Sequence, residues 1–313
     1  MRLSEPGTLH TMTLYLLPVA VAWGGWGIAG ALCLAIAAAI VGMYLRLRPV
    51  VSPPTSRPRL HTISYSHYVE KVRWCLDRAG VEYEEVPNIG ILGVLLLGRT
   101  VPTLELPAAR TRIGNSAEIL RLLWGMYGEE PAGRAGFLRP AAEAVALEQH
   151  LDRALGEQVR RWAYSRLFED RDLTLQMWGF GEPAVPRWQR ILLPLLRPLL
   201  RATVRRMLYV TPATALRALE RTRAVFDEID ARLADGRRYL LGDTLSYVDI
   251  TFASLGALAV LPEGYGGGAL ATRFPPAETL PPAWRDEVRE FRDRPAGQFI
   301  LRLYREERQA LNA

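Results

Sequence analysis

The sequence has 313 residues, 49% of them apolar and 23% charged, and 39 basic residues against 33 acidic ones give a net charge of +6. This composition excludes intrinsic disorder, collagen-like repeats and acidic tails, and the length predicts about two domains. Two cysteines are too few for a disulfide-stapled secreted scaffold, and the basic residues are interspersed with acidic ones rather than gathered in an arm, so nucleic acid is not an expected partner.

Residues 1–48 predict a membrane anchor. From Thr11 to Leu45 the sequence contains no acidic, basic or histidine residue, and about 20 apolar residues are enough to span a bilayer as a helix. We place the span at Trp26–Leu45, and residues 9–23 either lie at the membrane interface or form the second leg of a hairpin. A cleaved signal peptide fits less well, because its apolar region is only about 7 to 15 residues long.

The charges beside this span predict its orientation. Four arginines follow the span, at positions 46, 48, 57 and 59, whereas only Arg2 and the amino terminus precede it. The positive-inside rule then puts the main body on the cytoplasmic side of the lipid bilayer, and a hairpin would give the same side. Residues 27, 31, 35 and 39 are glycine or alanine, a spacing that suits a homodimer of membrane helices but also arises by chance.

Residues 49–57 form a Pro/Ser-rich linker, and residues 58–128 predict an α/β domain. A β-α-β unit comes first, followed by an apolar segment, a strand that starts at Pro102, a second strand and a helix with a capping box at Asn115 and Glu118. An X-Pro bond, such as the one at this strand start, is the one place where a cis peptide costs little free energy. The expected elements are Leu60–Ser64, Ser66–Ala79, Val81–Val86, Ile89–Leu97, Val101–Leu106, Arg110–Ile113 and Asn115–Tyr127.

Residues 129–140 read as a second linker, and residues 141–313 predict an all-helical domain. Long amphipathic patterns run over Ala141–Phe168 and Ala215–Leu233, and strand signals are nearly missing. Ser246 and Asp249 have the spacing at which each side chain caps the backbone of the other, so we expect them to start a helix. The fold class expected from the whole chain is a transmembrane helix, a thioredoxin-like α/β domain and an all-α domain.

Several short motifs, in this order along the chain, resemble those of glutathione transferases. Four of them resemble the N-terminal domain of that family and the last two resemble its C-terminal signature. The resemblance covers about residues 58–313. The motifs are SHYVEKVRW at 66–74, VEYE at 81–84, VPTL at 101–104, IGNSAEI at 113–119, YLLGD at 239–243 and SYVDI at 246–250.

This resemblance implies glutathione as co-substrate and a site that favours its thiolate. Ser66 falls at the family's activating position, where a hydroxyl and a helix N-terminus both stabilise thiolate. A plain helix cap is the other interpretation of Ser66, and Tyr65 is the alternative hydroxyl. Val69 stands where redox-active relatives have a second cysteine, which argues against a dithiol oxidoreductase.

By the same resemblance, other residues contact the rest of glutathione. The backbone of Val101, held by a cis Pro102, would pair with the cysteinyl part. Asn115 and Ser116 would receive the γ-glutamyl carboxylate at a helix N-terminus, although the family more often has an acidic residue or Gln at the position of Asn115. His67 could also touch glutathione or lie in solvent.

The helical domain would supply a pocket for an apolar electrophile. Trp162 and Tyr164 on its first long helix are candidates for the pocket wall, and dimerisation is a further expectation from the resemblance. The four histidines are scattered without paired-ligand spacing, so we expect no metal.

The segment Pro186–Val210 carries an unusual pattern. Arg187, Arg190, Arg197, Arg201 and Arg205 share one helical stripe, and Ile191, Leu195, Leu199 and Met207 are expected opposite it. This arrangement suits a helix lying on an anionic membrane, a helix that packs its apolar face on the core, or a cover for the co-substrate pocket.

The sequence therefore predicts a membrane-anchored glutathione transferase-like protein that activates the thiol of glutathione. A non-catalytic scaffold or ligand sensor with the same fold, and a glutathione-dependent peroxide or disulfide reductase, are the two alternatives.

Overall fold

The computed structural model describes residues 36, 37, 40, 41, 44, 50, 52–63, 65–90, 100–129, 134–266 and 274–311. These residues belong to two compact units that interleave along the chain. Unit 1 comprises Met1–Ser64, Glu84–Asn115 and Leu175–Tyr209, and unit 2 comprises Tyr65–Tyr83, Ser116–Thr174 and Val210–Ala313. The consecutive domains expected at 58–128 and 141–313 stay a prediction.

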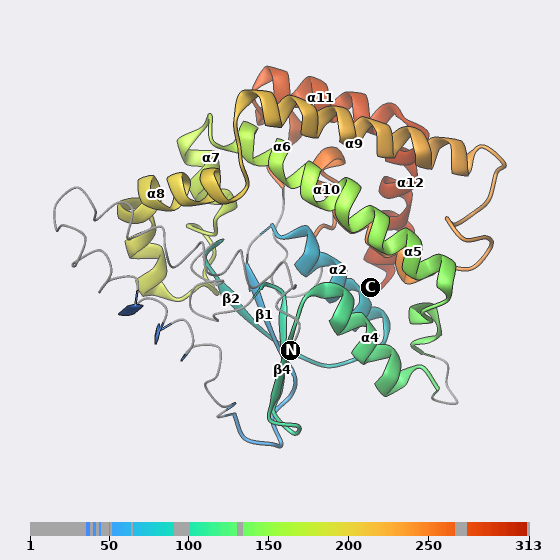
Figure 1. Ribbon diagram of the computed structural model, residues 1–313, viewed down its shortest axis with the longest axis horizontal. Coiled ribbons are helices and arrows are strands. Elements are labelled where there is room, and N and C mark those ends of the chain that lie inside the picture. The colour runs from blue at the N-terminus through green and yellow to red at the C-terminus, as the bar shows by residue number, and fades with distance from the viewer. Residues whose placement is uncertain are drawn as a thin grey trace. The chain divides into compact units, whose positions relative to one another are not determined.

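Unit 1 contains a four-stranded sheet with the order β2-β1-β3-β4 (Figure 1). Strand β1 pairs parallel to β2, and β3 pairs antiparallel to both β1 and β4. Together with the helices that follow β1 and β4, this is the predicted thioredoxin-like arrangement. The strands are β1 Arg59–Ile63, β2 Glu84–Asn88, β3 Thr103–Leu106 and β4 Thr111–Gly114.

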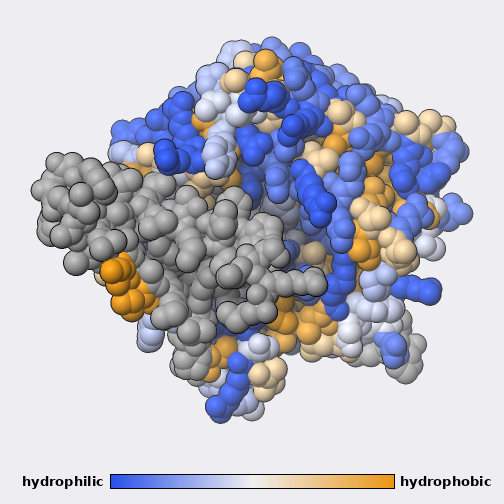
Figure 2. Space-filling model, in the orientation of Figure 1, coloured by the Kyte–Doolittle hydropathy of each residue, from blue (hydrophilic) through white to orange (hydrophobic). Residues whose placement is uncertain are grey.

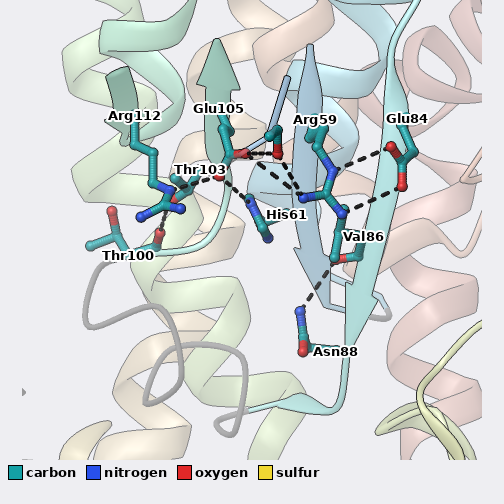
Figure 3. Close-up of polar contacts among 10 residues, drawn as sticks. Arg59, His61, Glu84, Val86, Asn88, Thr100, Thr103, Glu105 and Arg112 are labelled. Atoms are coloured by element: carbon teal, nitrogen blue, oxygen red, sulfur yellow. Dashed lines mark hydrogen bonds and ion pairs between the residues drawn. The ribbon is translucent and has the colours of Figure 1, made fainter. Parts of the chain in front are cut away.

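The two faces of this sheet differ in chemistry because side chains alternate along each strand. Leu60 of β1 lies opposite Leu104 of β3, and both are buried, which is the apolar face. Arg59 lies opposite Glu105 on the same strand pair, so charged groups gather on the other face (Figure 3).

Unit 2 is helical, and its predicted elements are present. The helix expected at Ser66–Ala79 is α2, and the helix expected at Asn115–Tyr127 is α4. The strand expected from Val81 begins later, at Glu84 in β2, because the Val81 N–H donates to Leu76 O and closes α2 instead. The helices of unit 2 are α2 His67–Arg78, α4 Ser116–Tyr127, α5 Ala142–Leu151, α6 Glu157–Leu167, α9 Pro212–Leu233, α10 Tyr247–Val260, α11 Pro282–Asp293 and α12 Pro295–Leu303.

Helix α10 is the centre of unit 2. All of its residues are buried, and α2, α5, α6, α11 and α12 pack around it (Figure 1). It starts at the predicted capping box, where the N–H and hydroxyl of Ser246 both donate to Asp249 Oδ2. Asp249 Oδ1 also accepts from the Leu240 N–H, so this carboxylate joins the preceding turn to the buried helix.

The long helix expected at Ala141–Phe168 is present as α5, a π-helical turn at Asp152–Gly156, and α6. Gly156 lies beneath the ring of Tyr68 from α2, where a Cβ atom would overlap the Tyr68 hydroxyl. A side chain at this position would therefore require the Tyr68 ring or the turn to shift, and the widened turn sits where α2 approaches closely.

Helices α7 and α8 lie partly or wholly in unit 1. Helix α8 spans Arg187–Met207, and α7 at Arg171–Met177 crosses the boundary between the units. No helix among the described residues is long and apolar enough to cross a membrane. The expected anchor lies outside the described residues, apart from positions 36, 37, 40, 41 and 44, which are helical.

Candidate functional site

Several residues that the sequence predicts to bind glutathione lie where strand β3 begins and strand β4 ends, in unit 1. Strands β1 and β4 run in the same direction because each is antiparallel to β3. The end of β4 and the start of β3 therefore lie at the same edge, since Thr103 pairs with Gly114. The Val101–Pro102 bond directly before β3 is cis, which confirms the prediction.

Val101 and Asn115 flank the sheet at this edge. Val101 lies two residues before Thr103, the first residue of β3, where the pairing with β1 ends, so the backbone of Val101 lies beyond the paired strands. Asn115 follows β4 and has a left-handed backbone, with φ of 71°. An N-cap residue usually has extended backbone, so Asn115 departs from the cap conformation that the sequence predicts.

Ser66 in unit 2 starts helix α2. Its backbone is extended, with φ of −79° and ψ of 113°, and its Oγ accepts from the Val69 N–H at 3.3 Å. A hydroxyl has one proton to donate in addition to its two acceptor sites. No acceptor in the described part of the chain takes that proton, and the side chain is half-buried. Ser66 therefore caps the helix and keeps a donor for a ligand.

Tyr65, the alternative hydroxyl, is fixed by aromatic packing within unit 2. Its ring stacks on Tyr265 with centroids 6.5 Å apart and contacts Phe274 at 5.4 Å. Its backbone has φ of 57°, a region that non-glycine residues rarely occupy. This geometry turns the chain sharply just before Ser66.

Ser116 begins helix α4 in the same unit. It is 2% exposed, and its Oγ has no hydrogen-bond partner among the residues that the structure describes. A buried hydroxyl without a partner is uncommon in folded proteins, and here it lies where the first-turn N–H groups of a helix favour an anion. The site therefore fits a ligand carboxylate.

His67 lies in the interior of unit 2. It is 2% exposed, and its Nε2 lies 3.1 Å from the Gly156 carbonyl oxygen. Burial lowers the pKa of His67 to about 3, and the charge of Arg160 acts in the same direction. The neutral ring thus ties α2 to the π-helical turn.

The two candidates for the electrophile pocket occupy different environments. Trp162 is fully buried, packs against Trp284 and Phe291, and donates from Nε1 to Glu287 at 2.9 Å. Tyr164 is half-buried, and its ring lies 5.3 Å from that of Phe168. Trp162 is thus a core residue of the helical unit, whereas part of the Tyr164 side chain is exposed.

Sequence reasoning missed a charged cluster on the polar face of the sheet (Figure 3). Glu105 accepts from Arg112 at 2.7 Å and from Ser52 at 2.8 Å, and His61 lies 3.5 Å away. Burial disfavours the Glu105 carboxylate, but donation by Arg112 and Ser52 outweighs this and lowers its pKa. The sequence signal that could have revealed the cluster is a polar residue at every second position of a strand: Arg59 and His61 in β1, and Thr103 and Glu105 in β3.

Buried ion pairs stabilise the interior of unit 2. Lys71 of α2 donates to Glu148 at 2.7 Å, and Arg121 pairs with the same carboxylate. Cys75 lies on the same helix and is buried, which raises the pKa of its thiol and makes it a poor nucleophile. No group of three or more potential metal ligands occurs in the described ranges.

Comparison with known proteins identifies this architecture. Residues 184–291 match the family described as glutathione S-transferase, C-terminal domain. A glutathione S-transferase of Ceriporiopsis subvermispora, solved with glutathione, is similar to the chain with a TM-score of 0.50 and 19% identity, over 80% of this chain and 97% of that one. No curated protein matches the chain.

Two further solved structures are similar at lower scores. The glutathione S-transferase of Pseudomonas fluorescens has a TM-score of 0.42 and 18% identity, over 77% of this chain and 97% of that one. Ure2p in complex with glutathione has a TM-score of 0.45 and 15% identity, over 80% of this chain and 96% of that one. The match over residues 184–291 and the similarity to the Ceriporiopsis structure show that the chain has the glutathione transferase fold, a thioredoxin-like sheet with helices followed by a helical domain.

Proposed function

We propose that the protein binds glutathione and activates its thiol for attack on an apolar electrophile. The observation that carries this proposal is the Ser66 hydroxyl, which caps α2 through an acceptor site and still has a proton to donate. A thiol with an ordinary pKa near 8.5 is mostly protonated at neutral pH, and only the thiolate is a strong nucleophile.

The chemistry requires little of the protein beyond stabilising one charge. The thiol proton leaves to solvent, and the sulfur keeps its electron pair. The Ser66 O–H and the N-terminal end of α2 both interact more favourably with thiolate than with thiol, so the bound thiol has a lowered pKa. The sulfur then forms a bond to the electrophilic carbon, and the leaving group departs with the electrons of the broken bond.

The N-terminus of α4 supports the binding half of the proposal. The Ser116 hydroxyl is buried without a described partner, and the γ-glutamyl carboxylate of glutathione would supply an acceptor for it. The resemblance adds the backbone of Val101, held by the cis Pro102, and the side chain of Asn115. Asn115 has no charge, so the ligand's ammonium group gains no ion pair from it.

The remaining candidates have narrower roles in this proposal. Tyr65 positions Ser66 through its packing on Tyr265, and His67 fixes the same helix from the interior. Tyr164 is the pocket candidate with accessible surface, whereas Trp162 is buried in the core.

We further propose that the protein is held at the cytoplasmic face of a membrane by residues 1–48, as a single span or a hairpin. The described positions in this stretch support the proposal, because they are helical and their apolar side chains are exposed to about half or more: 51% at Ile36, 56% at Ile40 and 53% at Val41. Such exposure is unfavourable in water and suits lipid. A homodimer is implied by the resemblance, and the glycine and alanine residues at positions 27, 31, 35 and 39 suit the packing of two membrane helices.

The experiment that tests the function compares the full chain with a Ser116→Ala variant. Calorimetry measures glutathione affinity, and turnover is followed with a chloro-nitroaromatic electrophile. We expect conjugation by the unaltered protein and weaker glutathione binding by the variant. Binding without any conjugation would favour the non-catalytic sensor, and conjugation with equal affinity in both would remove Ser116 from the site.

A further inference from the structure

Helix α8 of unit 1 exposes an apolar face. The side chains of Ile191 and Leu195 are 65% and 76% exposed, and those of Trp188 and Leu199 are 50% and 49% exposed. Their spacing of three and four residues puts them on one side of the helix. This outcome differs from the core-packing interpretation of the sequence, in which these residues would be covered.

The opposite side of α8 is held to the protein by a polar residue. Gln189 is buried, accepts from the Ile89 N–H at 2.8 Å, and donates from Nε2 to Asn88 Oδ1 at 2.8 Å. Both partners lie at the end of β2 in the same unit. A rotation of the helix that would bury Leu195 would therefore break two hydrogen bonds in the interior.

Exposed positive charge lies at both ends of α8. The sequence of α8 contains six arginines and no acidic residue. Arg187 at its start and Arg205 and Arg206 at its end are exposed, whereas Arg190, Arg197 and Arg201 lie on the side of the helix away from the apolar row and are half-buried. A surface that combines exposed apolar side chains with exposed arginines at both ends complements an anionic lipid surface in both chemistry and charge.

Two other features favour shallow contact with lipid. Trp188 at the first turn and Tyr209 just past the last turn are exposed, and such aromatic residues are favoured at the level of lipid headgroups. Pro194 and Pro198 have no N–H to donate within the helix, so two carbonyls lose their helical donors. Such carbonyls need water, which is present at the interface and not in the hydrocarbon core.

We propose that the exposed face of α8, formed by Trp188, Ile191, Leu195 and Leu199, docks onto the anionic surface of a lipid bilayer. This contact rests on α8 alone and does not depend on the anchor or on glutathione. By contrast, the outward side of α9 and α11 is mostly hydrophilic (Figure 2). Helix α9 therefore offers matched control positions.

The test uses the full chain with Cys33→Ser and Leu195→Cys, labelled with an environment-sensitive fluorophore. Cys75 is buried and does not compete for the label. The control carries the label at Leu216→Cys on α9, a leucine that is 56% exposed. The proteins are reconstituted with vesicles of phosphatidylcholine alone or of phosphatidylcholine with phosphatidylserine. We expect a blue-shifted, iodide-protected emission at position 195 only with phosphatidylserine, and none at position 216.

A second pair of variants tests the charge. We expect the equilibrium constant for docking to fall by about 100-fold in the triple variant Arg187→Gln, Arg205→Gln and Arg206→Gln. Each arginine near an anionic lipid surface contributes to the free energy of binding, and the variant loses three such contributions. The control, Arg217→Gln, Arg221→Gln and Arg305→Gln, removes three exposed arginines from unit 2 and should change it little. A solvated label at position 195 in both vesicles would overturn the proposal. Equal burial of the label with neutral lipid would also overturn the proposal. Burial of the label that depends on protein concentration in the absence of vesicles would overturn it too, because it would show that a second copy of the chain covers this face.

Discussion

Substitutions of Ser66 separate its capping role from its proposed chemical role. Threonine keeps an acceptor for the Val69 N–H and a proton to donate. Aspartate keeps the acceptor but has no proton at neutral pH, and alanine loses both. The three variants therefore report on helix stability and on thiol activation independently.

The magnitudes follow from the observed geometry. The cap hydrogen bond measures 3.3 Å, which is long for an N–H···O bond, so alanine should lower the free energy of unfolding by about 0.5–1 kcal/mol, the lower half of the usual range for N-caps. A hydrogen bond to a charged group is worth roughly 1.5–3 kcal/mol, which corresponds to a rise of about 1–2 units in the thiol pKa of bound glutathione when the donor is lost. Turnover near neutral pH should then fall by about 10- to 100-fold.

Urea denaturation gives the unfolding free energy, and thiolate absorbance against pH gives the thiol pKa of bound glutathione. We expect Ser66→Thr to preserve both quantities, Ser66→Asp to preserve stability while raising the thiol pKa, and Ser66→Ala to impair both. An unchanged thiol pKa in the aspartate variant would refute the role of Ser66 as donor and leave it a helix cap.

Three further predictions concern the interior of unit 2, and all are measured by denaturant unfolding of the full chain. Gly156→Ala should lower the free energy of unfolding by about 1–3 kcal/mol, because the added Cβ would overlap the Tyr68 hydroxyl. Adding Tyr68→Phe should restore part of this loss. An unchanged free energy of unfolding would show that the turn can shift. Burial lowers the pKa of His67 to about 3, so as pH falls from about 6.5 the unfolded chain binds a proton at this residue before the folded chain does. The free energy of unfolding should therefore drop by about 1 kcal/mol per pH unit down to about pH 3. His67→Gln should remove this pH dependence, and an identical slope in the variant would contradict the prediction. Lys71→Met should lower the free energy of unfolding by about 3 kcal/mol or more, because Glu148 then stays buried with less positive charge beside it. The double variant with Glu148→Leu should lose less than the sum of the two single variants. Strict additivity would argue against a coupled pair.

The sequence predicted those parts of the fold that local chemistry determines. The cis bond before Pro102 could be predicted from a proline at the start of a strand. The capping box of Ser246 and Asp249 could be predicted from the spacing of these two residues. The expected positions of β1, β4 and α2 agree with the structure to within about two residues, which is usual for boundaries read from periodicity. Each of these signals lies within a few residues of the element it defines.

The candidate site depended on contacts that no local pattern contains. The Asn115 capping pattern looks ordinary in sequence, yet its backbone is left-handed. His67 is the first residue of α2, a position where the sequence allows exposure to solvent, but its ring reaches Gly156, far away in sequence. In α8 the pattern showed two faces without showing which one is covered, because the buried side begins with the polar Gln189 rather than with a leucine.

Glutathione binding to the full chain is the most direct test of the central claim. Calorimetry gives the affinity, and a thiolate absorbance titration on the same complex gives the pKa of the bound thiol. The proposal predicts saturable binding and a thiol pKa well below that of free glutathione. The absence of binding at millimolar glutathione would contradict it and would direct the search toward protein partners at the membrane.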